Sequence, residues 1–321
     1  MENYNLRKGL LYGIICAFLI SFQPIISNLR PDIIDAYSFS TFTAVFIALF
    51  FFPLFIIERY KLKSLMKKEV SNRAISIMNG WKKKRNVKLF FLIGITFSIV
   101  PLLLIIGFDL AGAVNSSIAL KAEVIFALLF GYIFLKEKRI SKIQFLFCIA
   151  LFLGLLIAIT RGFADLPEFN IGVFIILFTV VIFTLVHTFT KSGFDRNEIT
   201  PIQVIFIRNL LSGGILLSIY LIFLPLEALI TLLNPEYLIY PLALGIDWGL
   251  SLFFWYKTLL YIEIGKAGVI NSITPIITAF FSFILLGEIF TIAHLVGVVI
   301  VIISIYMIVR EKKDKKEFMS E

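Results

Sequence analysis

The sequence is poor in charged and in metal-binding side chains. Of its 321 residues 16% are charged, and it has only two cysteines and two histidines, whereas a soluble domain has about 25% charged residues. Cys16 and Cys148 both lie inside apolar runs, which argues against a disulfide framework. His187 and His294 belong to no cluster with the spacing of a metal site, so we expect neither a metal nor another cofactor.

Apolar residues dominate the composition. They account for 60% of the chain, more than one water-soluble core can bury. A membrane-spanning helix takes about 20 residues, so ten such helices use about 200 and leave about 120 for loops and tails. This excludes large soluble domains, and with them a nucleotide-hydrolysing cassette. The composition predicts an all-α integral membrane protein.

Ten apolar runs are long enough to cross a membrane. The first follows Arg7 and Lys8 as a signal peptide would, but no small-residue cleavage site follows Ser27, so we expect it to remain as an anchor. The predicted spans are residues 9–27, 36–57, 89–108, 113–135, 143–160, 171–190, 203–224, 237–257, 265–286 and 291–309.

Basic residues concentrate on one side of these spans. With the N-terminus in the cytoplasm, the inner segments hold 26 of the 30 Lys and Arg residues, and the outer loops hold only Arg30 and Arg161. This bias predicts a multi-pass protein of the cell membrane with both termini cytoplasmic. Since the basic residues lie in short loops, a nucleic-acid partner is not expected. The run Trp81–Arg85, within the loop at about 58–88, either binds anionic lipid headgroups or anchors the topology with a short interfacial helix.

The chain repeats itself. Spans four and nine both end in Leu-x-Glu, at Glu137 and Glu288, which are 151 residues apart. We therefore divide the chain into residues 1–160, including the basic loop, and 161–321, including the basic tail. An odd number of spans in each half forces the second half to insert upside down. Two inverted five-helix repeats around a midplane site are typical of alternating-access transporters.

The residues of both halves resemble a known family. In the second half they are Arg208, the segment Gly265–Pro275, Gly287, Glu288 and Gly297, and in the first half Asn115–Ser117, Leu135–Glu137 and Gly154. This pattern is similar to the drug/metabolite transporter (DMT) superfamily, EamA type. The resemblance implies translocation of a small metabolite through a central cavity without ATP, and Glu137 and Glu288 that cap or gate. The chain departs from the family at Thr43, where a basic residue is frequent, and at Lys121–Val124, where proline is usual.

Three charged residues lie at membrane depth. Lys121, Glu123 and Asp247 each fall near the middle of a predicted span, where a charge costs about 2.5–3.5 kcal/mol. Two residues on a helix turn by about 200°, so Lys121 and Glu123 should point to nearly opposite sides. Either these groups line a cavity for an ionic solute, or Lys121 and Asp247 form a buried structural ion pair. Trp248 lines the same cavity or anchors the span at the interface.

A second candidate site surrounds a proline in span nine. Pro275 cannot donate a hydrogen bond to the Asn271 carbonyl, which leaves that acceptor free beside the side chains of Asn271, Ser272 and Thr274. These groups either line the cavity or stabilise a kink. Gln23 with Pro24, and Pro101, are expected to serve gating or curvature. Arg208 lies near the cytoplasmic end of its span and can extend its charge to the interface.

These features predict a secondary transporter that moves a small metabolite by alternating access, with export as the favoured direction. The substrate class stays open among amino acid-like solutes, organic ions and drug-like molecules, as does coupling to protons or ions. The expected partners are the small-molecule substrate and the lipid bilayer, and the protein is a monomer or a homodimer. The alternative is a lipid-handling protein or an enzyme of the membrane, but no catalytic arrangement with useful spacing is present, so no catalytic residue is assigned.

The charge bias gives a direct test of topology. Reporters fused at Leu166 and Pro235 should lie outside the cell, and reporters at Asn197 and Phe318 inside, because the loops richest in Lys and Arg stay in the cytoplasm. Two reporters are fused at the same four positions, one that is active only outside the cytoplasm and one that is active only inside it. Their activities show on which side each position lies. A consistent reversal at any position contradicts the inverted repeat.

Overall fold

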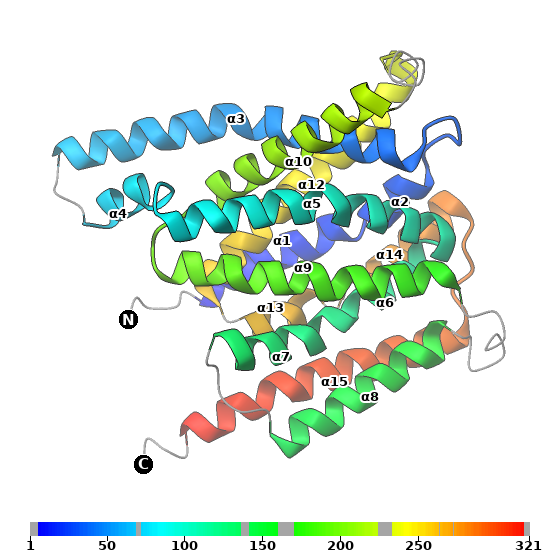
Figure 1. Cartoon of the computed structure of the whole chain (residues 1–321). Coiled ribbons are helices and arrows are strands. Elements are labelled where there is room, and N and C mark those ends of the chain that lie inside the picture. Colours follow the sequence, from blue (N-terminus) through cyan, green and yellow to red (C-terminus); the bar gives the residue numbers. More distant parts are fainter. Residues whose placement is uncertain are drawn as a thin grey trace.

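The computed structural model shows a bundle of helices that run roughly along one common axis (Figure 1). It describes residues 6–68, 72–135, 141–159, 170–223, 233–262, 264–271 and 273–317. Within these ranges all regular secondary structure is helical. The predicted all-α class is confirmed.

The ten predicted crossings correspond to ten helical segments, of which three are interrupted. The interrupted ones are span one, formed by α1 and α2, span four, formed by α6, the 3₁₀ turn η1 and α7, and span nine, formed by α13 and α14. The helices are α1 (Leu6–Ile20), α2 (Gln23–Asn28), α3 (Ala36–Lys68), α4 (Asn72–Gly80), α5 (Lys84–Ala111), α6 (Ala113–Ala119), η1 (Leu120–Ala122), α7 (Glu123–Phe134), α8 (Lys142–Ile159), α9 (Ile171–Asp195), α10 (Pro201–Phe223), α12 (Pro235–Tyr261), α13 (Ile264–Asn271), α14 (Thr274–Leu286) and α15 (Ile292–Glu317).

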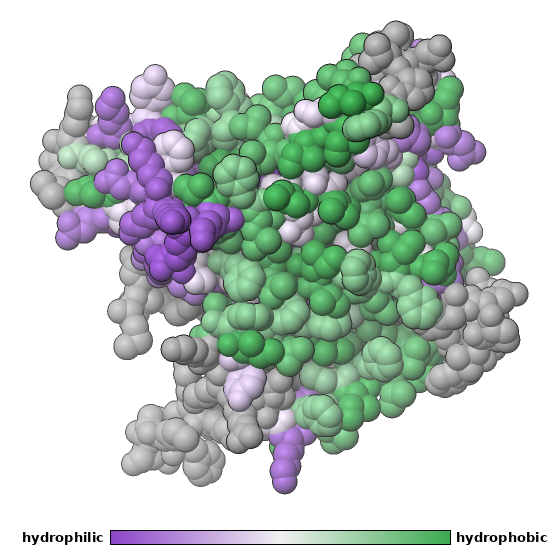
Figure 2. All heavy atoms as spheres, in the orientation of Figure 1, coloured by the Kyte–Doolittle hydropathy of each residue, from purple (hydrophilic) through white to green (hydrophobic). Residues whose placement is uncertain are grey.

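The surface of the bundle is an apolar belt. Figure 2 shows hydrophobic side chains over the middle of the molecule and hydrophilic ones gathered toward the end that carries α4. Phe91, Phe145 and Phe283 are each about 60% exposed, at 59%, 63% and 64%. Such exposure in many large apolar side chains marks a surface that meets lipid tails and not water. Seven helical segments have the length and composition of a full membrane span, and three shorter apolar helices add to them within α8, α14 and α15.

The two halves break their fourth span at equivalent places. α6 begins at Ala113 and α13 at Ile264, and α7 begins at Glu123 and α14 at Thr274. Both pairs are 151 residues apart, the same offset that separates the two Leu-x-Glu endings. The repeat is therefore present in the backbone as well as in the sequence.

Packing between helices follows the same repeat. α5 packs on α9, and α1 packs on α12, so that the first and third spans of each half meet those of the other. α8 and α15, the last spans of the halves, run side by side at one edge (Figure 1). Their close approach needs glycine, because a Cβ on Gly297 would lie 2.5 Å from the Gly154 carbonyl oxygen.

The segment at 58–88 is more helical than the predicted loop. α3 continues to Lys68, and α5 already begins at Lys84. Between them α4 buries Ala74, Ile77 and Gly80 and exposes its polar positions. A short amphipathic helix therefore occupies this segment. Trp81, at its end, lies beneath the guanidinium of Arg59 at 5.7 Å.

An ion-pair network ties α5 to the α9–α10 turn at this basic end. The buried carboxylate of Glu198 accepts hydrogen bonds from Lys83 Nζ at 2.7 Å, Arg85 Nη2 at 2.8 Å, Asn86 Nδ2 at 3.0 Å and Arg196 Nε at 3.1 Å. Burial alone would raise the pKa of Glu198, but these donors outweigh it and hold the pKa far below its ordinary value. The network stabilises the ionised carboxylate and with it the contact between the two halves.

Replacing Glu198 by Gln should therefore destabilise the protein, by about 1.5–3 kcal/mol at neutral pH, the range for hydrogen bonds to a charged group. Because the folded-state pKa is lowered, this contribution is complete above the ordinary pKa of about 4.3 and is lost as the pH falls further toward the folded-state value. The melting temperature of the detergent-solubilised protein, followed from about pH 6 to pH 3.5, should drop more steeply in the wild type than in Glu198→Gln.

Glu236→Gln is the matched control, since Glu236 is exposed at the start of α12. That variant should keep both the stability and the pH profile of the wild type. An identical pH profile for wild type and Glu198→Gln would show that the network adds nothing to the stability of the protein.

Candidate functional site

A cavity of about 90 Å³ lies inside the bundle, between the first, third, fourth, sixth, seventh, eighth and ninth spans. Both halves contribute to it, and α8 and α15 do not. Its polar lining residues are Gln23, Lys121, Glu123, His187, Arg208, Ser251 and Asn271, and its apolar ones are Ile20, Phe97, Val100, Leu104, Phe108, Leu120, Phe183, Trp248, Leu252 and Trp255.

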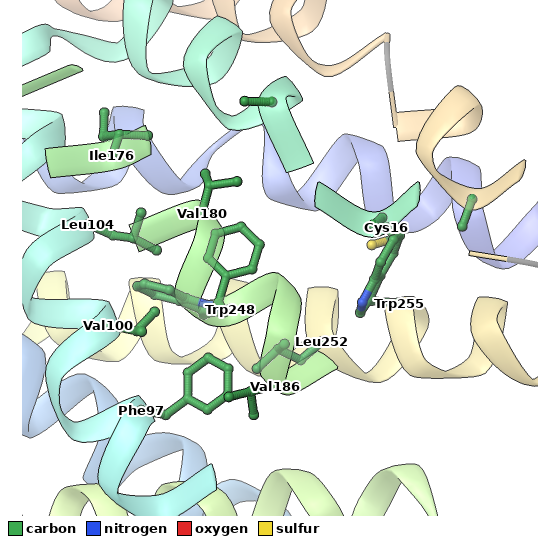
Figure 3. Packing of buried hydrophobic residues seen from close by; sticks show 14 of the residues in the cluster. Cys16, Phe97, Val100, Leu104, Ile176, Val180, Val186, Trp248, Leu252 and Trp255 are labelled. Carbon is green, nitrogen blue, oxygen red and sulfur yellow. The ribbon is translucent and has the colours of Figure 1, made fainter. Parts of the chain in front are cut away.

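Aromatic rings form much of the wall. Figure 3 shows Trp248 pointing from α12 into the space between α5, which carries Val100 and Leu104, and α9, which carries Val180. The His187 ring centroid lies 5.6 Å from that of Phe97, and 6.4 Å from that of Trp255. The wall of the cavity is therefore largely aromatic.

Lys121 has a specific partner across the centre of the molecule. Its Nζ donates to the backbone carbonyl of Asn271 at 2.9 Å, and both residues are buried. Asn271 is the last residue of α13, and its carbonyl is the acceptor that Pro275 leaves free. The two residues are 150 positions apart, so the broken fourth span of one half is bound to the broken fourth span of the other.

Glu123 lines the same cavity as Lys121, although the helical spacing predicted nearly opposite directions. The reason is that residues 120–122 form a 3₁₀ turn, so the spacing of a continuous α-helix does not apply. No ion pair within 4 Å joins Lys121 to Glu123 or to Asp247 in the described part of the chain. Lys121 and Asp247 are therefore not paired in this structure, and whether these charges form a site or a structural pair stays a prediction.

The other predicted residues of the second half are placed around the cavity. Trp248 and Asn271 line it. Asp247 and Thr274 are buried but are not among its lining residues, and Asp247 Oδ2 and Thr274 Oγ1 have no hydrogen-bond partner. Ser272 lies outside the described residues.

The proline positions differ from one another. Gln23, expected only at a gate or kink, lines the cavity, where its Nε2 donates to Ser251 Oγ at 2.8 Å. Pro24 and Pro275 lie in the first turn of α2 and of α14, just after an interruption in their spans. Pro101 lies inside α5, which continues as one helix from Lys84 to Ala111.

Glu288 caps a helix of the other half. Its carboxylate accepts the backbone N–H groups of Ala113 at 2.7 Å and Val114 at 2.9 Å, at the start of α6. Nearby, Arg30 binds Asp109 with an Nη1–Oδ1 distance of 2.7 Å. These residues border a polar hollow of about 480 Å³ at the end opposite to α4. Glu137, the corresponding acid of the first half, lies outside the described residues.

Arg208 and His187 are the main cavity residues that the sequence did not assign to the site. Arg208 was expected to extend to the interface, but it is only 2% exposed and lines the cavity. Its position two turns after the start of α10, followed by Asn209, Ser212 and Gly213, was the available signal of an inward-facing side. Within the described residues no group of three or more His, Cys, Asp or Glu side chains is placed to hold a metal ion.

Comparison with known proteins agrees with this architecture. The model of the EamA-like transporter family matches twice, over residues 7–160 and 170–310. The chain belongs to the EamA-like transporter family. An uncharacterized transporter of Methanothermobacter thermautotrophicus is 26% identical over 296 residues, which cover 88% of this chain and 79% of that protein. A crystal structure with 11% sequence identity has the same fold as this EamA-like chain, with a TM-score of 0.60 over 93% of this chain and 95% of the other.

A double-mutant cycle tests the partner of Lys121. Lys121→Met should destabilise the protein by about 1–3 kcal/mol, because it leaves the buried Asn271 carbonyl without a donor. Asp247→Asn should change stability independently, so the coupling energy between the two substitutions should stay below about 0.5 kcal/mol. Thermal unfolding in detergent of the wild type, both single variants and the double variant measures this. A double variant that regains the wild-type stability would show that Lys121 and Asp247 are paired after all.

Proposed function

We propose that the protein is a secondary transporter that carries a small polar or amphipathic metabolite across the cell membrane by alternating access, without ATP. The observation that carries this proposal is the position of the cavity. It lies where the two inverted halves meet, next to the contact between their broken fourth spans. Midplane sites at discontinuous helices are the usual arrangement in transporters built from inverted repeats.

The small volume of the cavity supports a protein that changes conformation to admit its solute. At about 90 Å³ it is well below the roughly 300–1,000 Å³ of common ligand pockets. Contacts between the halves close the bundle at both ends, through Glu198 at the basic end and through Glu288 at the other. We propose that these two sets of contacts open in turn, so that the cavity widens toward one side at a time.

The orientation, direction and coupling are parts of the same proposal. The distribution of basic residues supports cytoplasmic termini, which places the Glu198 network inside and the Glu288 cap outside. The proposed direction of movement is outward, as expected from the sequence. Lys121, Glu123 and Asp247 are the groups through which protons or ions would be coupled to it, and the protein works as a monomer or a homodimer.

Blocking the cavity tests this function. The purified protein is reconstituted into liposomes and screened for uptake and efflux of radiolabelled amino acids, organic cations and organic anions. Ser251→Trp should reduce transport of any solute identified at least tenfold, because Ser251 is 1% exposed and lines the cavity. Imposed pH and ion gradients then determine the coupling.

Ser218→Trp is the matched control, because Ser218 is an exposed serine on the surface of α10. It should transport as the wild type does. Gel filtration and melting temperature first establish that both variants are folded. Equal loss in both variants, or none in a folded Ser251→Trp protein, would contradict transport through this cavity.

A further inference from the structure

Three basic side chains are buried in the described part of the chain, and two of them have clear partners. Lys121 donates to the Asn271 carbonyl, and Lys191 approaches Asp195 Oδ1 at 3.5 Å and the Leu259 carbonyl at 3.4 Å. Arg208 differs. Its Nε and Nη1 atoms are buried and have no hydrogen-bond partner.

The side chains around Arg208 contact its guanidinium but carry no negative charge that would neutralise it. Its Cζ atom lies 3.4 Å from the ring centroid of Phe97, a cation–π contact. His187 and Tyr256 are its other close neighbours. No described acidic residue forms an ion pair with it. An arginine stays ionised in a protein and is costly at membrane depth, so an anion that reaches this position is stabilised by the unpaired Nε and Nη1 donors.

The acids of the site lie elsewhere. Glu123 and Asp247 are both near Cys16 of α1, together with Lys121. Among the charged residues that line the cavity, Glu123 and Lys121 therefore lie near one another, and Arg208 comes from another helix, α10. Because no described acidic residue forms an ion pair with Arg208, an incoming anion is attracted to that part of the cavity.

The part of the cavity near Arg208 also restricts the shape of what binds there. Phe97, Phe183, His187 and Trp255 surround it with rings. Among the described cavity residues next to these rings Arg208 is the one Lys or Arg side chain, and its single positive charge matches a carboxylate better than the double charge of a phosphate. The planar guanidinium matches the geometry of a carboxylate in the same way.

We propose that Arg208 forms a carboxylate-binding subsite, and that the solute handled by this protein is an organic carboxylate with a flat apolar group next to the charge. This inference rests on the proposed function only in taking the cavity as the place where the solute binds. Binding can be measured in detergent without any transport, so the two can fail separately.

The test compares ligands that share a phenyl group and differ in the charged end. 3-Phenylpropanoate carries a carboxylate, 3-phenylpropanamide is neutral and phenethylamine is a cation. Fluorescence titration of the full-length protein reports binding, because Trp248 and Trp255 line the cavity. Trp81→Phe removes the third tryptophan, which is at the surface. The carboxylate should bind at least tenfold more tightly than the amide or the amine.

Substitution of Arg208 then assigns the preference to one residue. In Arg208→Gln the affinity for 3-phenylpropanoate should fall at least tenfold, to that of the amide, while the affinity for the amide stays unchanged. The melting temperature of the ligand-free variant should not fall, because the substitution removes an unpaired buried charge. A purely structural arginine would behave in the opposite way. Arg208→Lys, which keeps the charge without the planar group, should bind with intermediate affinity and serves if the glutamine variant does not fold.

Lys191→Gln is the control, as it removes another buried cation that does not line the cavity. It should retain the preference for the carboxylate. Equal affinity for the three ligands, tighter binding of phenethylamine, no binding of the carboxylate, or a preference that survives in Arg208→Gln would each overturn the proposal. A preserved preference in a protein that transports nothing would instead reject the proposed function and leave the subsite in place.

Discussion

The structure depends on how backbone groups are satisfied where helices break inside an apolar belt. Lipid offers no hydrogen bonds, so every free carbonyl in the belt needs a donor from the protein. Pro275 frees the Asn271 carbonyl, and Lys121 of the other half supplies the donor. Span one is treated in the same way, because the Thr278 hydroxyl of α14 donates to the Ser21 carbonyl at 3.0 Å. The breaks are tolerated because they satisfy each other.

This solution joins the halves at the same level as the cavity. Any motion of one half against the other must either preserve the Lys121 contact as a pivot or exchange it for another acceptor. The ends of the bundle are closed by contacts of a different kind, between the Glu288 carboxylate and the start of α6, and between Glu198 and its basic donors. At the basic end the side chains of Lys83 and Arg85 are 50% and 57% exposed, so water can replace their hydrogen bonds when they separate from Glu198.

Much of this arrangement could be predicted from the sequence, and the limits have a physical cause. The spans follow from long apolar runs, and the repeat follows from the Leu-x-Glu endings 151 residues apart. Pro275 also predicted the free carbonyl of Asn271, because that effect is local. Its donor was not predictable, since Lys121 is 150 residues away. The inward direction of Arg208 was missed because apolar residues occur on every side of α10, so hydrophobic periodicity does not say which side meets protein and which meets lipid, and the polar neighbours Asn209 and Ser212 were the remaining signal.

The repeat is symmetric in its backbone but not in its chemistry. At the break in the first half the chain carries Lys121 and Glu123, and the corresponding positions of the second half, 151 residues later, carry Ser272 and Thr274, which are uncharged. A symmetric cavity would receive a solute equally well in two orientations related by the pseudo-twofold axis. With Glu123 in one half and Arg208 in the other, only one orientation brings a negative group to the guanidinium and keeps it away from the carboxylate. Because Lys121 donates its hydrogen bond to the Asn271 carbonyl, it is held in place without an ion pair to Glu123 or Asp247. The two halves are thus equivalent in where their fourth spans break, and they differ in the charges that they bring to the cavity.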